Sequence, residues 1–559
     1  MIHLTRFNHH VISAGLCLLM GWPVLAFSQT LPQLPVIPDI SCGTSSGKTT
    51  MVPSGGKLQA AIDAASPGDR ILLEAGATFV GPITLKVKPG TGCITIRTSA
   101  PDSALPPTGE RISPEYANVM AKIVSPGFNQ NALKVANGAH HYKFIGIEFT
   151  KVNEAVTVSV LIDVGDAMMT SLSQVPHHIE LDRVYVHGLP ASSLKQCIIL
   201  NGAALTVQNS YVSECKIVGF DSQAILGYNG PGPFRIINNY LEGAGENVMF
   251  GGADPRIPDL VPSDIEIRRN LFSKPLHWKM SDPSYAGTHW SIKNLFELKN
   301  AQRVLVDGNI FEYCWADAQV GYGIMLTVRN QSHTAPWSTV QDVTFTNNII
   351  RHVAHGLNLT GTDSNAPSQP TKRVLIKNNL WLDVGTPQWG GGGRLFQIAL
   401  GPSDVTIEHN TGFQTGPIIM AAGLPPSVNF VFRDNIAPHN AYGVFGDGAG
   451  VGLTAINKYF PGIQFIANVL ISNPYPTKYP ADNYNATGIS AVGFTDVAAE
   501  DYRLTSASPY SQKATDGTDV GVNWARLQAA LPETAHNNGS PAHVDLSPPS
   551  DLSVVPDSH

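Results

Sequence analysis

The stretch LVDGNIF, residues 305–311, contains the phrase that decides the fold: alternating apolar residues, then Asn, then an apolar pair. The phrase returns at residues 236–241, 267–272, 345–350, 376–381, 407–412 and 432–437. Its Asn residues are Asn239, Asn270, Asn309, Asn348, Asn379, Asn410 and Asn435, about 25–39 residues apart. A period of this length is typical of a solenoid in which each repeat forms one coil.

Each repeat reads as short β-strands rather than as a helix pair. The alternating apolar residues fit strands with one face toward a common core, and each Asn falls where the chain turns. Stacking the turns would let each Asn amide bond the backbone of neighbouring coils. A second strand column precedes the Asn phrases, at residues 197–202, 247–252, 295–300, 324–330, 356–361 and 395–400. The sequence therefore predicts an all-β, right-handed parallel β-helix with at least two sheets per coil.

The composition agrees with a single elongated domain. Of the 559 residues, 43% are hydrophobic and only 14% are charged, while 52 Gly and 41 Pro favour a turn-rich β architecture. The formal net charge of -7 argues against nucleic acid as a partner. An anionic polysaccharide remains compatible with this charge, because a local basic site can lie on an acidic protein. We expect a monomer.

The first 28 residues read as a signal peptide. Arg6 precedes an apolar stretch at residues 11–27, and Ala26 and Ser28 are small residues at a plausible cleavage point. A membrane anchor is the alternative reading of this segment. No other segment is long and apolar enough to span a bilayer, so the mature chain is expected to be secreted or periplasmic.

The rest of the chain divides into three parts. Residues 29–56 are rich in Pro, Ser and Gly and are expected to form a lead-in segment. Residues 57–531 are assigned to the β-helix domain with its N- and C-terminal caps. The N-terminal cap is an amphipathic helix at residues 57–65, which would cover the open end of the first coil. Residues 532–559 are polar and Pro-rich, and are expected to be disordered.

The export signal permits disulfides in the mature chain. Cys42 and Cys93 flank the expected cap, and Cys197 and Cys215 lie on neighbouring strands, so each pair is a plausible bridge. Other connectivities stay open, because spacing alone does not fix the pairing. Cys314 is then left over, and we expect it to be a buried free thiol.

The second strand column carries the candidate site. In residues 295–300, alternation directs Phe296 and Leu298 into the core, so Glu297 and Lys299 face outward. Long flanking segments suggest loops that wall a groove. Ionisable and aromatic residues crowd the same region: His277, Trp278, Lys279, His289, Trp290, Tyr313, Trp315, Asp317 and Tyr322.

The next strand offers a second outward cation. In residues 324–330, Leu326 and Val328 face the core, whereas Thr327 and Arg329 face outward. Arg329 lies one coil after Lys299, so the two cations are expected side by side. They repel each other unless an anion joins them. A solvated charged face is the alternative interpretation.

A crowded Lys–Arg pair suits β-elimination on a uronic acid polysaccharide. The enzyme must neutralise the sugar carboxylate, remove the adjacent proton with a base, and assist the leaving oxygen. A lysine crowded by an arginine gives up its own proton more readily and so can act as the base. An arginine or a Ca²⁺ ion can hold the carboxylate.

Residues 299–309, KNAQRVLVDGN, and residues 326–331, LTVRNQ, resemble the signature of the alginate lyase and chondroitinase B family of β-helix polysaccharide lyases. The resemblance implies that Lys299 is the catalytic base and that Arg329 assists the acid side. In this sequence Asn330 and Gln331 replace the family's His-Gly. The family's two acidic calcium ligands correspond to Ile292 and Asn294, which leaves Glu297 as the nearest acidic candidate for a Ca²⁺ ligand.

Further residues are expected to bind substrate. They are Glu246, Asp254 and Arg256 in a Gly/Pro-rich stretch, together with Lys279, Trp315 and Asn330. The Asp residues of that stretch could instead cap a turn. Two other functions stay open: a glycoside hydrolase that uses paired carboxylates such as Glu246, Asp254, Glu297 or Asp317, and a solenoid that only binds glycans. The leading prediction is a polysaccharide lyase that cleaves a uronic-acid-containing polysaccharide.

Overall fold

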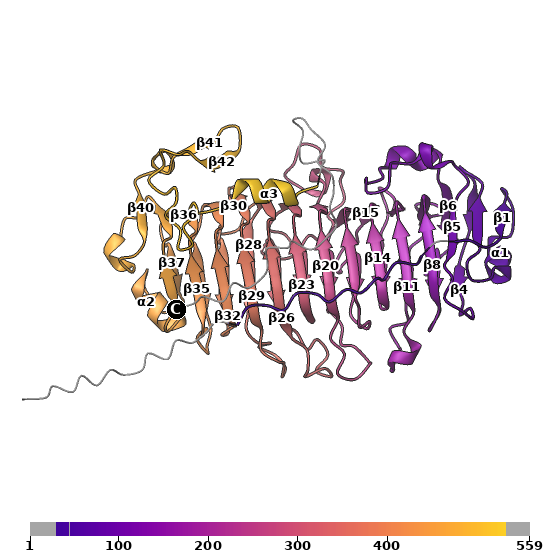
Figure 1. Ribbon diagram of the computed structural model, residues 1–559, viewed down its shortest axis with the longest axis horizontal. Coiled ribbons are helices and arrows are strands. Elements are labelled where there is room, and N and C mark those ends of the chain that lie inside the picture. Colours follow the sequence, from indigo (N-terminus) through magenta and orange to yellow (C-terminus); the bar gives the residue numbers. More distant parts are fainter. Residues whose placement is uncertain (1–29, 44, 533–559) are drawn as a thin grey trace, which may run out of the picture.

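The computed structural model describes residues 30–43 and 45–532, and within them the predicted all-β parallel β-helix is confirmed. Strands lie side by side along one long axis (Figure 1). Sheet A has 14 strands, from β1 (Thr49–Val52) to β38 (Gln464–Ile466). Sheet B also has 14 strands, and sheet C has 12. The predicted signal peptide and most of the predicted tail lie outside the described residues.

Apart from the two ends of the solenoid, each coil contributes one strand to each sheet, in the order A, B, C. One coil runs through β20 (Ser263–Arg268), β21 (Leu271–Ser273) and β22 (Asn294–Leu298). Each strand pairs in parallel with its counterpart in the next coil, β23 (Ala301–Asp307) in the case of β20. The sequence pattern indicated at least two sheets. The third was hidden because the Asn phrase itself crosses from sheet A to sheet B.

The predicted Asn ladder is confirmed at this A-to-B corner. The Oδ1 of Asn309 accepts hydrogen bonds from the backbone N–H of Asn270 at 2.9 Å and from its Nδ2 at 3.0 Å. The Nδ2 of Asn309 donates to the Oδ1 of Asn348 at 3.0 Å and to the carbonyl of Ile267 at 2.9 Å. The ladder extends beyond the repeated phrase through Asn468 and Asn483.

The two ends of the solenoid are closed by short helices, as Figure 1 shows. Helix α1 (Leu58–Ala64) confirms the predicted N-terminal cap, and its Leu58 and Ile62 join the main core. Helix α2 (Leu453–Tyr459) packs at the other end against β37 (Val444–Gly446). Sheet pairing begins at β1, inside the segment predicted as a lead-in.

The preceding residues 30–43 run along the outer face of sheet A, visible in Figure 1 as the indigo trace across the strands. The backbone N–H of Gln33 donates to the carboxylate of Asp342 at 3.0 Å, and that of Val36 to Asp264 at 2.9 Å. The predicted disulfide Cys42–Cys93 is formed and ties this segment to the first coils.

The second predicted disulfide, Cys197–Cys215, is also formed. It joins β13 (Leu194–Leu200) of sheet C to β15 (Tyr211–Cys215) of sheet B across the interior. Cys314 is free and buried, as predicted. Among the residues described, no helix is long and apolar enough to cross a bilayer.

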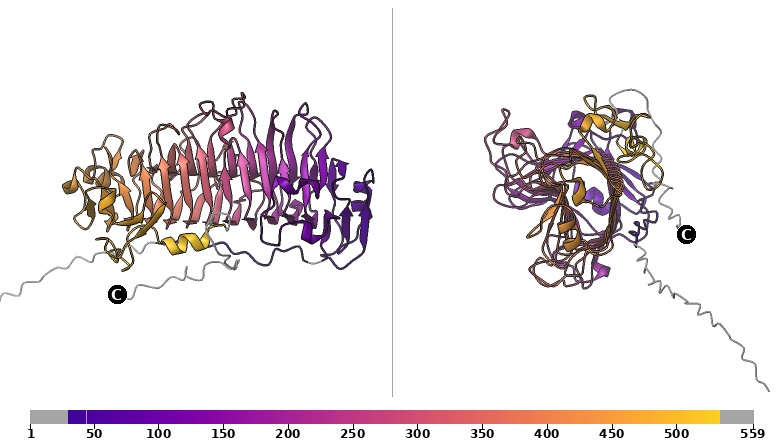
Figure 2. Two further views of the ribbon diagram at one scale, coloured as in Figure 1. Left: turned by 90° about the horizontal axis from the view of Figure 1, so that it is seen from above. Right: turned by 90° about the vertical axis from the view of Figure 1, so that its left-hand side faces the viewer.

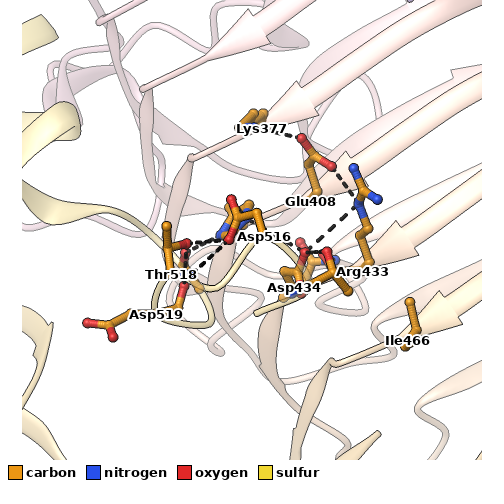
Figure 3. Close-up of polar contacts among 12 residues, drawn as sticks. Lys377, Glu408, Arg433, Asp434, Ile466, Asp516, Thr518 and Asp519 are labelled. Atoms are coloured by element: carbon orange, nitrogen blue, oxygen red, sulfur yellow. Dashed lines mark hydrogen bonds and ion pairs between the residues drawn. The ribbon is translucent and has the colours of Figure 1, made fainter. Parts of the chain in front are cut away.

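The C-terminal segment folds back along sheet B. Helix α3 (Trp524–Ala530) places Leu527 in an apolar cluster with Ile310 and Leu382 of the sheet. The end-on view in Figure 2 shows this segment outside the closed ring of strands. Asp434 anchors the approach to α3, because its carboxylate accepts from the backbone N–H of Thr515 at 2.7 Å and from its hydroxyl at 2.6 Å. Figure 3 shows the surrounding polar network.

Candidate functional site

The candidate site lies on the outer face of sheet C in the middle coils. Four consecutive strands build it: β19 (Glu246–Phe250), β22, β25 (Tyr322–Thr327) and β28 (His355–Thr360). The loops that enter and leave these strands are long, with residues 274–293 preceding β22 and residues 328–339 following β25. The chain thus presents side chains of sheet C between two groups of loops.

The predicted alternation in residues 295–300 is confirmed, with one irregularity. Phe296 and Leu298 lie in the core, but so does Leu295. Two successive inward residues shift the pattern by one position, so Asn294 and Glu297 both lie on the outer face. The Nδ2 of Asn294 donates to Oε2 of Glu297 at 3.2 Å.

Glu297 is the buried partner of Lys299. The Nζ of Lys299 lies 3.6 Å from Oε1 of Glu297, which is an ion pair longer than a hydrogen bond. The hydroxyl of Thr327 donates to the same carboxylate oxygen at 3.3 Å. Glu297 is 2% exposed, whereas the side chain of Lys299 is 14% exposed. Within the described residues the Lys299 ammonium forms no hydrogen bond, so its donors remain available to an anion.

Arg329 lies on the next coil with a carboxylate partner of its own. Its backbone N–H donates to the carbonyl of Lys299 at 2.9 Å, which confirms that the two residues are neighbours. Its guanidinium Nη1 lies 3.2 Å from Oδ1 of Asp363, whose side chain is 2% exposed. The Arg329 side chain is 30% exposed. Each of the two cations is therefore paired with a buried carboxylate.

Asp363 was not singled out in the sequence. It follows β28 and also accepts hydrogen bonds from the backbone N–H groups of Asn330 at 2.9 Å and Asn365 at 2.9 Å. Its position beside Arg329 depends on how the loops of two coils stack, which no local pattern records. The only local signal was the turn sequence GTDSN at residues 361–365.

Glu246 lies on the strand before Glu297 and is fully buried. Its Oε2 accepts from Nε2 of Gln223 at 2.6 Å, while its buried Oε1 has no hydrogen-bond partner within the described part of the chain. Burial, reinforced by the negative charge of Glu297, raises the pKa of Glu246 to about 7. The charge of Lys299 opposes this shift.

The raised pKa predicts how Glu246→Gln changes stability with pH. The folded state binds the Glu246 proton more tightly than the unfolded state, so this group destabilises the fold increasingly as pH rises from 4.5 to about 7. Glutamine removes that loss. Relative to wild type, the free energy of unfolding of the variant should rise by on the order of 3 kcal/mol across this window. Chemical denaturation at stepped pH values measures it.

Glu408→Gln is the control, because its effect on the free energy of unfolding should change with pH in the opposite direction. Burial alone would raise the pKa of Glu408, but the charges of Lys377 and Arg433, drawn in Figure 3, outweigh burial and hold that pKa below its usual value. Its stabilising contribution is present above the unfolded pKa and lost as pH falls. The Glu408→Gln deficit should therefore shrink on acidification. Equal pH slopes for the two variants would contradict both assignments.

The remaining predicted binding residues lie in the surrounding loops and make contacts of other kinds. Asp254 accepts hydrogen bonds from the backbone N–H groups of Ser332 at 3.0 Å and Thr334 at 2.9 Å, which ties two loops of the same wall together. Arg256 is exposed in the Asp254 loop, whereas Lys279 is buried and bonds Ser281.

Trp315 and Asn330 make internal contacts. Trp315 packs in an aromatic cluster with Trp278, Trp290 and Trp389, formed by the loops that enter sheet C. The Nδ2 of Asn330 donates to the carbonyl of Pro367 at 2.8 Å, and its Oδ1 accepts from the backbone N–H of Ala335 at 2.8 Å. Both residues position the loops around the cations.

The environment of Glu297 does not fit a calcium ion. Ca²⁺ takes six to eight oxygen ligands. The Glu297 carboxylate instead receives hydrogen bonds from Asn294 and Thr327 and lies beside the positive charge of Lys299. A second cation at this carboxylate would be repelled, so no step of the chemistry below involves Ca²⁺.

Comparisons with known proteins give likenesses of overall architecture only. No protein-family profile and no curated protein sequence matches the chain. Among solved structures, the catalytic unit of the GH87 α-1,3-glucanase of Streptomyces thermodiastaticus is 12% identical, with a TM-score of 0.48 over 81% of this chain and 72% of that one. The PL6 family alginate lyase AlyGC is 14% identical, with a TM-score of 0.47 over 85% of this chain.

A third structure, pectate lyase Pel9A, is 14% identical and has a TM-score of 0.31 over 86% of this chain and 97% of its own. The chain spans 58% of the length of AlyGC. At such identities and TM-scores none of these structures assigns an activity to this protein. The function must be argued from its own side chains.

Proposed function

We propose that this protein is a carbohydrate-active enzyme, a polysaccharide lyase that cleaves a uronic-acid-containing polysaccharide by β-elimination. One observation carries the proposal. Lys299 and Arg329 lie on consecutive coils along sheet C. Each forms an ion pair with a buried carboxylate, and each side chain is partly exposed. Two such cations, side by side between loops, form a site for an anionic chain.

In the proposed reaction, Arg329 binds the sugar carboxylate. This neutralises charge on the acid and makes the adjacent carbon–hydrogen bond easier to break. Lys299, in its unprotonated form, removes that proton. The electron pair forms a carbon–carbon double bond, the bond to the glycosidic oxygen breaks, and that oxygen takes up a proton from an acid, for which Arg329 or water is available.

Glu297 is a positioning residue in this scheme. When Lys299 takes up the substrate proton it becomes an ammonium ion, and the Glu297 carboxylate at 3.6 Å stabilises the new charge. Asn294 and Thr327 hold the carboxylate in place by their hydrogen bonds. Asp363 has the corresponding role for the guanidinium of Arg329.

A glycoside hydrolase is the second candidate, because the environments of Glu246 and Glu297 differ. Glu246 has a raised pKa and favours its protonated form, while Glu297 lies beside a cation. A pair of this kind supplies an acid and a base. The burial of both carboxylates counts against it, since Glu246 is 0% and Glu297 2% exposed. Lys299 and Arg329 are the more accessible groups.

Mass spectrometry of reaction products distinguishes these candidates. The purified protein would be incubated with alginate, pectate, dermatan and chondroitin sulfates, heparan sulfate and hyaluronan. Elimination gives fragments that have gained no water and end in an unsaturated uronate. Hydrolysis takes up one water molecule for each bond cleaved and leaves no unsaturated end, and products of that kind would overturn the proposal. Binding to a polymer without any cleavage would identify a glycan-binding solenoid instead.

A further inference from the structure

Four histidines meet on sheet A, far along the axis from the candidate lyase site. His140 and His141 open β8 (His140–Ile145), and His177 and His178 open β11 (His177–Asp182). The strands are paired in register, with His140 opposite His177. All four side chains are partly exposed. The same two-residue motif is therefore stacked on neighbouring coils at the protein surface.

The ring nitrogens lie close together. Within each strand the two Nδ1 atoms are 2.8 Å apart. Between strands, the rings of His140 and His177 stack at 4.7 Å, and those of His141 and His178 at 4.5 Å. One ligand nitrogen each from His141, His177 and His178 lies within 4.8 Å of the others.

The positions of sheet A that align with His141 and His178 form a row across the strands. Further along the sheet, this row holds residues of opposite charge. Further along, the position of His141 and His178 is occupied by Asp264 and then Arg303, which form an ion pair at 2.7 Å. Asp342 and Arg373 repeat that arrangement at 2.5 Å. Opposite charges thus stabilise neighbouring coils there. Four imidazoles offer no such compensation among themselves, because they repel one another when protonated.

The ring nitrogens of His141, His177 and His178 lie within reach of one metal ion. Neutral imidazole is a ligand for zinc, copper and nickel, whereas calcium and magnesium prefer oxygen.

We propose that His141, His177 and His178 form a binding site for a divalent transition metal ion, with zinc as the simplest occupant. A metal ion with bonds of about 2.0–2.1 Å joins nitrogens that are roughly 3 to 4 Å apart. The 2.8 Å contact between the Nδ1 atoms of His177 and His178 is a hydrogen bond, so a metal ion would replace that bond with two metal–nitrogen bonds. The nitrogen of His141 lies within 4.8 Å of the other two. His140 remains the neighbour that can hydrogen-bond or complete the set.

The lead-in segment brings one carboxylate near the histidines. Residues 30–43 follow the same row, as the bonds from Gln33 and Val36 to Asp342 and Asp264 show. Asp39 is exposed, and its negative charge acts on His178. This charge would favour a cation bound by the histidines.

Calorimetric titration tests the proposal on the full chain, purified without a histidine tag. Zn²⁺, and in parallel Ca²⁺, would be titrated into wild type, into His141→Gln, His177→Gln and His178→Gln, and into His333→Gln, an exposed loop histidine elsewhere. We expect one Zn²⁺ at micromolar or tighter affinity, at least tenfold weaker binding in each of the first three variants, and no change in His333→Gln. Ca²⁺ should not compete.

A second readout does not depend on variants. The electron paramagnetic resonance spectrum of the wild type with one equivalent of Cu²⁺ should show coupling to at least three imidazole nitrogens. Zn²⁺ binding that is absent, or that is equally strong in the His141, His177 and His178 variants, would overturn the proposal. The four rings would then be a stacked surface row only. Neither readout depends on the proposed lyase activity.

Discussion

Lys299→Met should reduce the rate of polysaccharide cleavage by about 10²–10⁴-fold, the range expected for loss of a general base. Methionine keeps the length and apolar stem of lysine but has no basic nitrogen. Because Lys299 forms no hydrogen bond within the described residues and lies 3.6 Å from its nearest charged partner, its loss should leave the fold intact. Initial rates on the best substrate of the uronate panel measure the effect, and binding of the same polymer should weaken less than the rate falls.

Lys134→Met is the matched control. Lys134 also lies on the outer face of sheet C, in β7 (Leu133–Val135), several coils away. It should retain wild-type activity. Glu297→Gln refines the test, since a carboxylate that stabilises the Lys299 ammonium should change the pH dependence of the rate and not only its maximum. Wild-type rates in Lys299→Met would remove Lys299 from the reaction.

Asn309→Ala should lower the free energy of unfolding by about 3–5 kcal/mol. The substitution removes two hydrogen bonds accepted by Oδ1 and two donated by Nδ2. It leaves the backbone N–H and the Nδ2 of Asn270 without those acceptors, and the carbonyl of Ile267 without that donor, in a fully buried corner. Each buried polar group left unpaired costs about 1–3 kcal/mol. Chemical denaturation gives the loss.

Asn153→Ala provides the comparison for a surface asparagine. Asn153 is exposed in a loop, and its side chain accepts one local bond from the backbone of Ala155. Its replacement should cost less than about 1 kcal/mol. Amide hydrogen exchange should quicken in the coils of Asn270 and Asn348 only for the ladder variant. A ladder variant as stable as Asn153→Ala would show that the Asn residues are tolerated at the corner rather than stabilising it.

Much of this fold could be predicted because every coil of a solenoid must meet the same structural requirements. Each coil must bury apolar residues and satisfy a tight corner, so the Asn phrase recurs with regular spacing. The alternation that placed Glu297 and Lys299 outward is equally local. The disulfide Cys42–Cys93 could be predicted because its two cysteines flank the expected N-terminal cap.

Contacts that depend on the stacking of coils were not predictable. The sequence does not place Asp363 beside Arg329 or Asp254 beside Thr334, because those pairs join loops of different coils and lengths. The sequence also did not show that Leu295 and Phe296 both face the core. The apolar residues at 296 and 298 alone fit a regular alternating strand. The four histidines of sheet A come together only through the pairing register of β8 and β11, which the sequence does not give.

The ultraviolet absorbance of unsaturated uronate ends, followed over time for wild type and Lys299→Met on the same panel of polymers, tests the central claim most directly. The structure predicts a steady rise with wild type on at least one polymer and almost none with the variant. Cleavage that produces new reducing ends with no rise in absorbance would contradict elimination, and it would assign the chemistry to Glu246 and Glu297 instead.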